Sequence, residues 1–298
     1  MSDLVFTIAG SHQGQRKMGV ETGFTAVMGQ LPEDIITNDL RESYHFDKPI
    51  YGSYLLGKSM LQTSRNHSLG DKSIFFTVGG CHTITFGTYY ASSTLRDDIH
   101  LIWIDAHPDI NTPASSYSGN CHGMPMAYIM GLVHSKKMTG LKNLNPSRVA
   151  YIGLRCIDDD EEIFLQKLET DGLIRFSAQD VKQNGINSII NSIENHWKIK
   201  EANKNTDKDS EVIEKNTVQI HISLDIDSMD PEFTPATGTP VPDGLQPDDV
   251  KEVIRWANNV SSLRKCHLDI TEINPYLASI DGVNKTYKTV KEIVDVYL

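Results

Sequence analysis

Short runs of mostly apolar residues recur along the chain, and longer segments with helical features separate many of them. A strand that is apolar at nearly every position is typical of a parallel sheet, because helices cover both faces of such a sheet. The predicted strands are residues 4–9, 73–78, 99–105, 149–154, 173–177, 218–225 and 266–270. The predicted helices are residues 83–98, 123–135, 159–171, 186–199 and 247–260. This alternation predicts a doubly wound α/β fold.

The chain has 298 residues, which is enough for one large α/β domain or two small ones. Neither an internal repeat nor a clear linker divides it, so we expect one domain over residues 1–298. Residues 198–217 differ in composition, since they are mainly Lys, Asn, Asp and Glu. Such a segment buries little apolar surface, and we expect a solvated, mobile insertion there.

Charge and cysteine content narrow the class of protein. A formal net charge of −11 and a pI near 5.4 argue against a nucleic-acid partner. The first ten residues carry no basic segment, which argues against a secretory signal. No apolar run approaches the length of about 18 residues that spans a membrane, which argues against a membrane span. The cysteines form no C-x-x-C pair, as is typical of reduced thiols in a cytoplasmic protein; they are Cys81, Cys121, Cys156 and Cys266.

Acidic and imidazole side chains follow several of the predicted strands at the point where each strand ends. The clearest case is the stretch WIDAHPDIN, with Asp105, His107 and Asp109 at alternate positions. The carboxyl ends of parallel strands meet at one edge of a sheet, where such folds bind ligands. The residues expected at this edge are His82, Asp105, His107, Asp109, Asp158, Asp225, Asp227 and Glu272.

Four of these acids would bring four negative charges into one crevice, where repulsion and desolvation would force protons onto some of them. Two divalent cations would balance that charge, so the cluster predicts a dinuclear site with bridging carboxylates. Its ligands would be the carboxylates and two imidazoles, namely Asp105, Asp109, Asp225, Asp227, His82 and His107. A set rich in carboxylates and without thiolates favours Mn²⁺ over Zn²⁺, with cobalt and iron as alternatives.

Each motif alone also has an ordinary structural explanation. Acids at strand ends often cap helices, the alternating acids of LDID can lie on a solvated edge, and a single histidine such as His82 is more often structural. The combination at separate strand ends favours a metal site. The other histidines have no acidic neighbours of this kind, and we interpret them as surface or packing residues: His12, His45, His67, His100, His134, His196, His221 and His267.

Several motifs together resemble those of the ureohydrolases, in the same order along the chain, and the arginase branch in particular. They are GGCHTIT, WIDAHPDINTP, SGNCHGMP, YIGLRCID, SLDIDSMDPEFTPATGTPVPDGL and LDITEINP. The resemblance covers roughly residues 19–275. DINTP followed by SGNCHGMP is closer to arginases than to agmatinases or formiminoglutamases. The resemblance implies a single α/β domain with about eight mostly parallel strands and a metal site at their carboxyl ends. It also implies a homotrimer or hexamer.

The resemblance implies two Mn²⁺ ions per subunit and the hydrolysis of L-arginine to L-ornithine and urea by a hydroxide that bridges the ions. One ion would be held by His82, Asp105, Asp109 and Asp225, and the other by Asp105, His107, Asp225 and Asp227. His122 would transfer protons, Asp109 would relay one to the departing amine, and Glu272 would face the guanidinium. The implied substrate-binding residues are His107, Asn111, Ser118, Asn120, Asp158, Thr239 and Glu272.

The chain also departs from the family pattern. Cys81 and Cys156 stand where the family usually has acids, in G-G-D-H-S and L-R-D-x-D, and this predicts altered support of the metal ligands. Two other functions stay open: a ureohydrolase acting on agmatine or a guanidino acid, and a catalytically silent regulatory subunit. Agmatine has no α-carboxylate for Asn111 and Ser118 to bind, and a silent subunit would be expected to lack metal ligands. Redox control through either cysteine is a further idea, although buried cysteines are usually inert.

Overall fold

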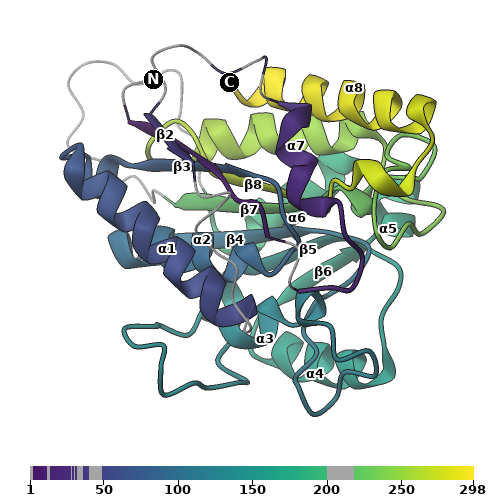
Figure 1. The fold of residues 1–298 in the computed structure, drawn as a ribbon. Helices are drawn as coiled ribbons and strands as arrows, with labels where there is room; N and C mark the ends of the chain where they lie inside the picture. The colour runs from purple at the N-terminus through teal and green to yellow at the C-terminus, as the bar shows by residue number, and fades with distance from the viewer. Residues whose placement is uncertain are drawn as a thin grey trace, which may run out of the picture.

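The protein is described here by a computed structural model of residues 3–11, 14–27, 29, 31, 36–39, 49–199 and 218–298. Within these residues, a single sheet of eight strands has the order β2-β1-β3-β8-β7-β4-β5-β6, and every neighbouring pair is parallel (Figure 1). The strands are β1 Leu4–Ile8, β2 Ile36–Asp39, β3 Ile74–Val78, β4 Ile99–Ile104, β5 Val149–Leu154, β6 Ile174–Ser177, β7 Gln219–Asp225 and β8 His267–Thr271. The predicted fold class is confirmed.

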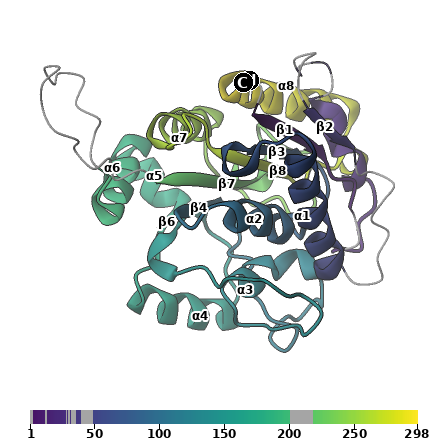
Figure 2. The ribbon, with the colours of Figure 1, turned by 90° about the vertical axis from the view of Figure 1, so that its left-hand side faces the viewer.

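Helices cover both faces of the sheet, as Figures 1 and 2 show. The α-helices are α1 Pro49–Asn66, α2 Ile84–Leu95, α3 Pro125–Ile129, α4 Asp159–Thr170, α5 Ala178–Asn184, α6 Ile186–Trp197, α7 Pro247–Val260 and α8 Ile280–Tyr297. Short 3₁₀ helices are η1 Val20–Ala26, η2 Gly70–Lys72, η3 Cys121–Gly123, η4 Pro146–Arg148, η5 Ile226–Ser228 and η6 Pro275–Leu277. Helices α6, α7 and α8 lie on one face, and α1, α2, α3 and α4 lie on the other.

The apolar character of the strands follows from this arrangement. In β4, Ile102 and Ile104 belong to the core beneath α6, α7 and α8, whereas Leu101 and Trp103 belong to the core on the opposite face. Successive side chains of a strand point to opposite faces, so both sets are buried. The apolar runs of the sequence therefore predicted β3, β4 and β5 well, whereas the central strands β7 and β8 also bury polar side chains.

Some elements differ from the prediction or were not predicted. The predicted strands 4–9, 73–78, 99–105, 149–154, 173–177, 218–225 and 266–270 were found with ends shifted by one residue at most, whereas β2, α1, α5 and α8 were not predicted. The predicted helix 123–135 is wrong in length, because α3 ends at Ile129. Gly131 has a φ of 73°, and an added Cβ would lie 2.3 Å from the Asn143 side chain, so the chain turns away there.

Two glycines let α1 and α2 pack with their backbones in close contact. A Cβ at Gly57 would lie 2.2 Å from the Gly87 carbonyl oxygen, and one at Gly87 would lie 1.8 Å from the Ser53 carbonyl oxygen. The Gly87 amide also donates a hydrogen bond of 2.8 Å to the Ser53 hydroxyl. This contact fixes α2, which begins at Ile84, two residues after His82.

Part of the chain lies outside the described residues. This applies to His12 and His45 and to most of the predicted insertion, of which only Lys198 and Ile199 are described. The predicted mobility of residues 198–217 and the single domain over the whole chain therefore stay predictions. Among the described helices, none combines the length and the apolar character needed to cross a membrane.

We expect Gly87→Ala to lower the free energy of unfolding by about 1–3 kcal/mol or more, because the new methyl group would overlap the backbone of α1. Helix propensity alone would predict the opposite sign, a gain of about 1 kcal/mol. Urea denaturation measures the difference, and Thr94→Ala on the exposed side of α2 is the control. A variant as stable as the parent would contradict the close packing of the two helices.

Candidate functional site

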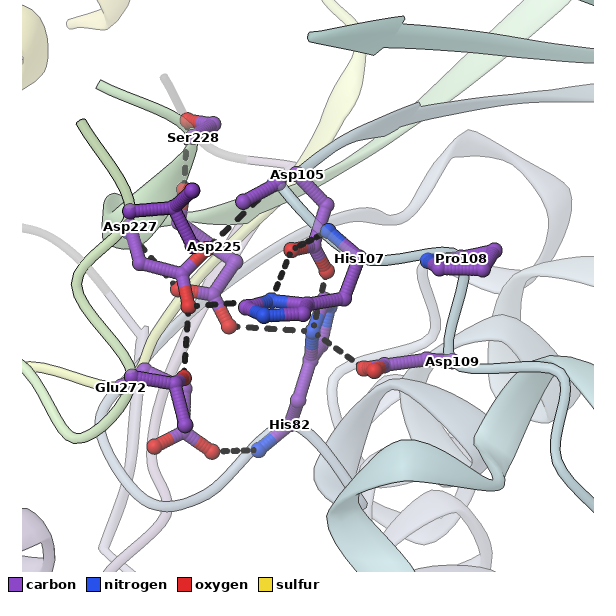
Figure 3. A network of polar contacts seen from close by, with 12 residues as sticks. His82, Asp105, His107, Pro108, Asp109, Asp225, Asp227, Ser228 and Glu272 are labelled. Carbon is purple, nitrogen blue, oxygen red and sulfur yellow. Dashed lines mark hydrogen bonds and ion pairs between the residues drawn. The ribbon is translucent and has the colours of Figure 1, made fainter. Parts of the chain in front are cut away.

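The predicted site residues meet at the carboxyl edge of the sheet, where β3, β8, β7 and β4 are neighbours. Figure 3 shows their side chains pointing toward one another from separate strand ends. His82, Asp105 and Glu272 are fully buried, and Asp227, Asp225 and Asp109 are only 1%, 3% and 7% exposed. Side chains that prefer water are thus enclosed together beside the apolar core.

One group of possible metal ligands surrounds His82. Its Nδ1 atom lies 3.0 Å from Asp105 Oδ2, 2.9 Å from Asp109 Oδ2 and 3.3 Å from Asp225 Oδ2. None of these contacts has the geometry of a hydrogen bond, whereas the Nε2 atom is 2.8 Å from the Ser223 hydroxyl. A buried nitrogen that faces three carboxylates without a hydrogen bond fits a shared cation.

A second group surrounds His107 and shares Asp105 with the first. His107 Nδ1 lies 3.5 Å from Asp105 Oδ1 and 3.3 Å from Asp227 Oδ2. The triads His82–Asp105–Asp109 and Asp105–His107–Asp227 each present ligand atoms within 4.8 Å of one another. Two adjacent groups of possible ligands thus share Asp105, which is compatible with the dinuclear site that the charge argument predicts.

Local hydrogen bonds explain the alternating spacing of these ligands. Asp105 Oδ1 accepts a hydrogen bond of 2.8 Å from the His107 amide, and Asp225 Oδ1 accepts one of 2.8 Å from the Asp227 amide. A carboxylate that binds the amide two residues later turns the chain at the strand end. Trp103 supports the same cluster, since its Nε1 donates to Asp105 Oδ2 at 3.0 Å and its ring stacks on His82.

The electrostatics of the cluster agree with a site that requires positive charge. Without ions, burial and the charge of Asp105 raise the pKa of Asp109 to about 6. Burial and the charges of Asp227 and Asp105 raise the pKa of Asp225 well above its ordinary value. Burial opposes the charging of His82, but contacts with three carboxylates outweigh it and raise the pKa of the imidazole. Protons therefore occupy the cluster that cations would otherwise neutralise.

Glu272 and His122 form a pair beside this cluster. The Glu272 backbone has a φ of 63°, and its carboxylate accepts hydrogen bonds from the His82 amide at 2.8 Å and from Gln15 Nε2 at 2.6 Å. His122 Nδ1 lies 3.3 Å from Glu272 Oε1, and the His122 side chain is 17% exposed. Burial alone would raise the pKa of Glu272. The contact with His122 is the largest of the effects that lower this pKa, and together they outweigh burial, so the pKa is lowered and the carboxylate stays charged.

The predicted substrate-binding residues lie in three places. Asn111 Nδ2 donates to Asp158 Oδ2 at 3.0 Å, and the Asn120 amide donates to the Ser118 hydroxyl at 3.1 Å. Asn111 is buried, whereas Asp158 and Ser118 are exposed. The Thr239 hydroxyl donates to Asp227 Oδ2 at 2.7 Å and so touches a possible metal ligand. The structure thus gives the contacts of these residues, and their roles in substrate binding stay predictions.

The sequence did not identify several supporting residues. Arg155 donates hydrogen bonds to backbone carbonyls of the segment after β7, including Asp227 at 2.7 Å and Val241 at 2.7 Å. Ser223, two residues before Asp225 on β7, lies on the same face and contacts His82. The period-2 spacing could have indicated Ser223. Gln15 carries no motif that could have identified it.

The two unusual cysteines lie in different environments. Cys81 is fully buried against Thr83, and burial raises the pKa of its thiol to about 11, which argues against redox reactivity there. Cys156 is exposed, and its side chain is near enough to His107 to contribute to the raised pKa of that imidazole. The departure at Cys156 therefore adjoins a possible metal ligand directly.

The histidines predicted to be surface or packing residues lie outside the cluster wherever they are described. His221 is buried between Asp269, at 2.9 Å from Nε2, and Ser92, at 2.9 Å from Nδ1. His267 is also buried, with Nδ1 accepting a hydrogen bond from the Phe75 amide. His100 packs edge-on against Trp197, and the exposed ones are His67, His134 and His196.

Binding of Mn²⁺ to the cluster should strengthen as the pH rises from about 6 to about 8, because protons compete with cations for the same atoms. Without ions the pKa of Asp109 is raised to about 6, at the acid end of this range, and the pKa values of His82 and His107 are raised as well. Calorimetric titrations in buffers of different ionisation enthalpy would measure both the affinity and the protons released. An affinity independent of pH, or binding that survives Asp105→Asn, would contradict the site.

Comparison with known proteins agrees with this geometry. The family model described as "Arginase family" matches residues 46–297. The arginase of Eremothecium gossypii is 37% identical over 213 residues, which is 69% of this chain but only 47% of that protein, so the match spans about half of that relative. The protein "Arginase-2, mitochondrial" of Mus musculus is 32% identical over 306 residues, or 95% of this chain and 80% of the relative.

A solved structure is similar over nearly the whole length. Entamoeba histolytica arginase, crystallised in complex with L-ornithine, has a TM-score of 0.76 and 26% sequence identity, with 97% of each chain covered. The family match extends over well more than half of the present sequence. The chain belongs to the arginase family.

Proposed function

We propose that the protein is a binuclear manganese-dependent arginase that hydrolyses L-arginine to L-ornithine and urea. The observation that carries the proposal is the pair of ligand groups that share Asp105, with the charged Glu272 carboxylate beside them. Ions would bind near His82 and His107, and the guanidinium would bind at Glu272. The sequence motifs and family membership support the same reaction.

The ions would be held by the carboxylates and the two imidazoles. One set is His82, Asp105, Asp109 and Asp225, and the other is Asp105, His107, Asp225 and Asp227. Hard carboxylate oxygens combined with imidazole nitrogens, and no thiolate in either set, favour Mn²⁺. When bound, the two ions would lower the pKa of water and so make a strong nucleophile available near neutral pH.

Glu272 would bind and orient the guanidinium group of the substrate. Its buried carboxylate stays charged, and a carboxylate forms two parallel hydrogen bonds with a guanidinium. The His82 amide and Gln15 Nε2 donate hydrogen bonds to this carboxylate, so it is already oriented when the substrate binds. Such preorganisation places the guanidinium carbon next to the ligand cluster.

His122 and Asp109 would move the protons of the reaction. His122 is partly exposed, and its contact with Glu272 outweighs burial and raises the pKa of its imidazole, so it can carry a proton at neutral pH. It would exchange protons with solvent and supply the departing amine. Asp109, whose Oδ2 lies 2.9 Å from His82 Nδ1, would relay a proton to the same amine.

The α-amino acid end of arginine would bind at the rim of the site. Asn111 and Ser118 would receive the α-carboxylate, and Asp158 would bind the α-amino group. Asn120, Thr239 and His107 complete the proposed set. The contact between Asn111 and Asp158 supports this proposal, because it places an amide donor beside an exposed carboxylate.

Assembly and location are proposed from the family resemblance. We propose a cytoplasmic homo-oligomer, either a trimer or a hexamer, which analytical ultracentrifugation of the full chain would distinguish. A catalytically silent regulatory subunit receives less support, since all the proposed ligand positions carry His or Asp.

Protein loaded with Mn²⁺ should release urea from L-arginine, and Asp227→Ala should abolish this activity by removing a buried ligand carboxylate. Asp295→Ala, on the exposed face of α8, is the matched control and should keep the parent rate. Agmatine, which lacks the α-carboxylate, should be a much poorer substrate. Agmatine turnover equal to that of arginine would favour the other ureohydrolase activity, and no urea from either compound would contradict the proposal.

Cys156→Asp should tighten Mn²⁺ binding by about tenfold or more, because a carboxylate accepts a hydrogen bond from His107 more strongly than a thiol does. Chelator competition measures the affinity. Cys156→Ser keeps the size of the side chain without adding charge, and it should bind Mn²⁺ about as tightly as the parent. If the aspartate variant binds Mn²⁺ no better than the serine variant, the prediction is wrong, and the thiol at position 156 does not weaken Mn²⁺ binding through His107.

A further inference from the structure

Gln15 contacts the site from a part of the chain that none of the motifs includes. It lies far from the other site residues in sequence, yet its Nε2 atom donates a hydrogen bond of 2.6 Å to Glu272 Oε2. Gln15 is 9% exposed and Glu272 is fully buried, so water competes little for this contact. A hydrogen bond to a buried charged group is among the stronger ones in proteins.

The contact divides the two oxygens of the Glu272 carboxylate between different donors. Oε1 accepts from the His82 amide at 2.8 Å and lies 3.3 Å from His122 Nδ1. Among the described residues, Gln15 is the donor to Oε2. Fixing both oxygens sets the plane of the carboxylate, because rotation about its terminal bond is otherwise broad.

The backbone around Gln15 is itself fixed against the site. The Gly14 carbonyl accepts a hydrogen bond of 3.0 Å from the His122 amide, so the two adjacent residues hold both members of the His122–Glu272 pair. On the other side, a Cβ at Gly238 would lie 3.2 Å from Gln15 Oε1 and 3.6 Å from Glu272 Oε2. The amide is thus confined between Glu272 and the segment that precedes Thr239.

We infer that Gln15 is a positioning residue that sets the plane in which Glu272 meets the guanidinium of the substrate. The inference rests on the proposed function, since it assigns Glu272 to the guanidinium. A guanidinium is planar, and it forms two good hydrogen bonds only with a carboxylate close to its own plane. Gln15 itself does not contact the reacting atoms and acts through Glu272.

The test compares Gln15→Met with the parent in the manganese-loaded full chain. Methionine keeps a similar volume and cannot donate a hydrogen bond. Because the guanidinium would lose its oriented partner, the KM for L-arginine should rise by about tenfold or more, with a smaller fall in kcat. The inhibition constant of L-norleucine, which has the amino acid group and no guanidinium, should stay within about twofold of the parent value.

Two further variants distinguish a role of Gln15 in orienting Glu272 from a role in the stability of the fold. Gln62→Met changes the same residue type on the exposed side of α1 and should keep the parent KM. Gln15→Asn keeps an amide that is too short to reach Glu272, and it should raise KM as methionine does even if the methionine variant folds poorly. Bound Mn²⁺ and the thermal midpoint are measured for every variant and should not change.

The possible outcomes have distinct meanings. An unchanged KM in both Gln15 variants would overturn the inference and leave the proposed function intact. Loss of Mn²⁺ and of norleucine binding together with activity would also overturn it, since that result indicates a structural role. A parent protein that releases no urea from arginine would overturn the proposed function, and the inference with it.

Discussion

The mutual repulsion of buried carboxylates is the constraint on which the rest of the site depends. Asp105, Asp109, Asp225 and Asp227 are almost fully enclosed, and burial together with neighbouring charges raises the pKa of three of them in the protein without ions. Such a cluster is unfavourable unless positive charge compensates it. The same constraint therefore explains why imidazoles face the acids, and it supports the proposed pair of cations.

The sheet supports two of the possible ligands, His82 and Asp105, through side chains one row below them. Thr77, Asp269, Ser223 and Trp103 form one register row across β3, β8, β7 and β4, directly beneath the ligands. Ser223 contacts His82, Trp103 donates to Asp105, and Asp269 accepts from Thr88 and lies beside His221. Buried hydrogen bonds from regular strands hold the site more rigidly than flexible loops would.

Prediction from sequence succeeded where a local pattern carried the signal. The strands β3, β4 and β5 are apolar at nearly every position, whereas β7 and β8 alternate apolar and polar residues. The ends of these strands carry the acids and histidines that the structure brings together. It failed for α1, whose buried face mixes Gly52, Ser53, Gly57 and Ser64 with the apolar residues that a helical pattern would show. It also overestimated α3, because the local pattern does not show the left-handed backbone at Gly131 or its close approach to Asn143.

The sequence by itself determined the residue types and spacings of the site. Alternating acids after buried strands require compensating charge wherever they meet, and that requirement does not depend on the details of the fold. Only the tertiary structure decided which atoms face one another: His82 Nδ1 toward three carboxylates, Cys156 against His107, and Gln15 against Glu272. These contacts join residues from separate strands and loops, and the order of the strands in the sheet, which no local pattern encodes, brings them together.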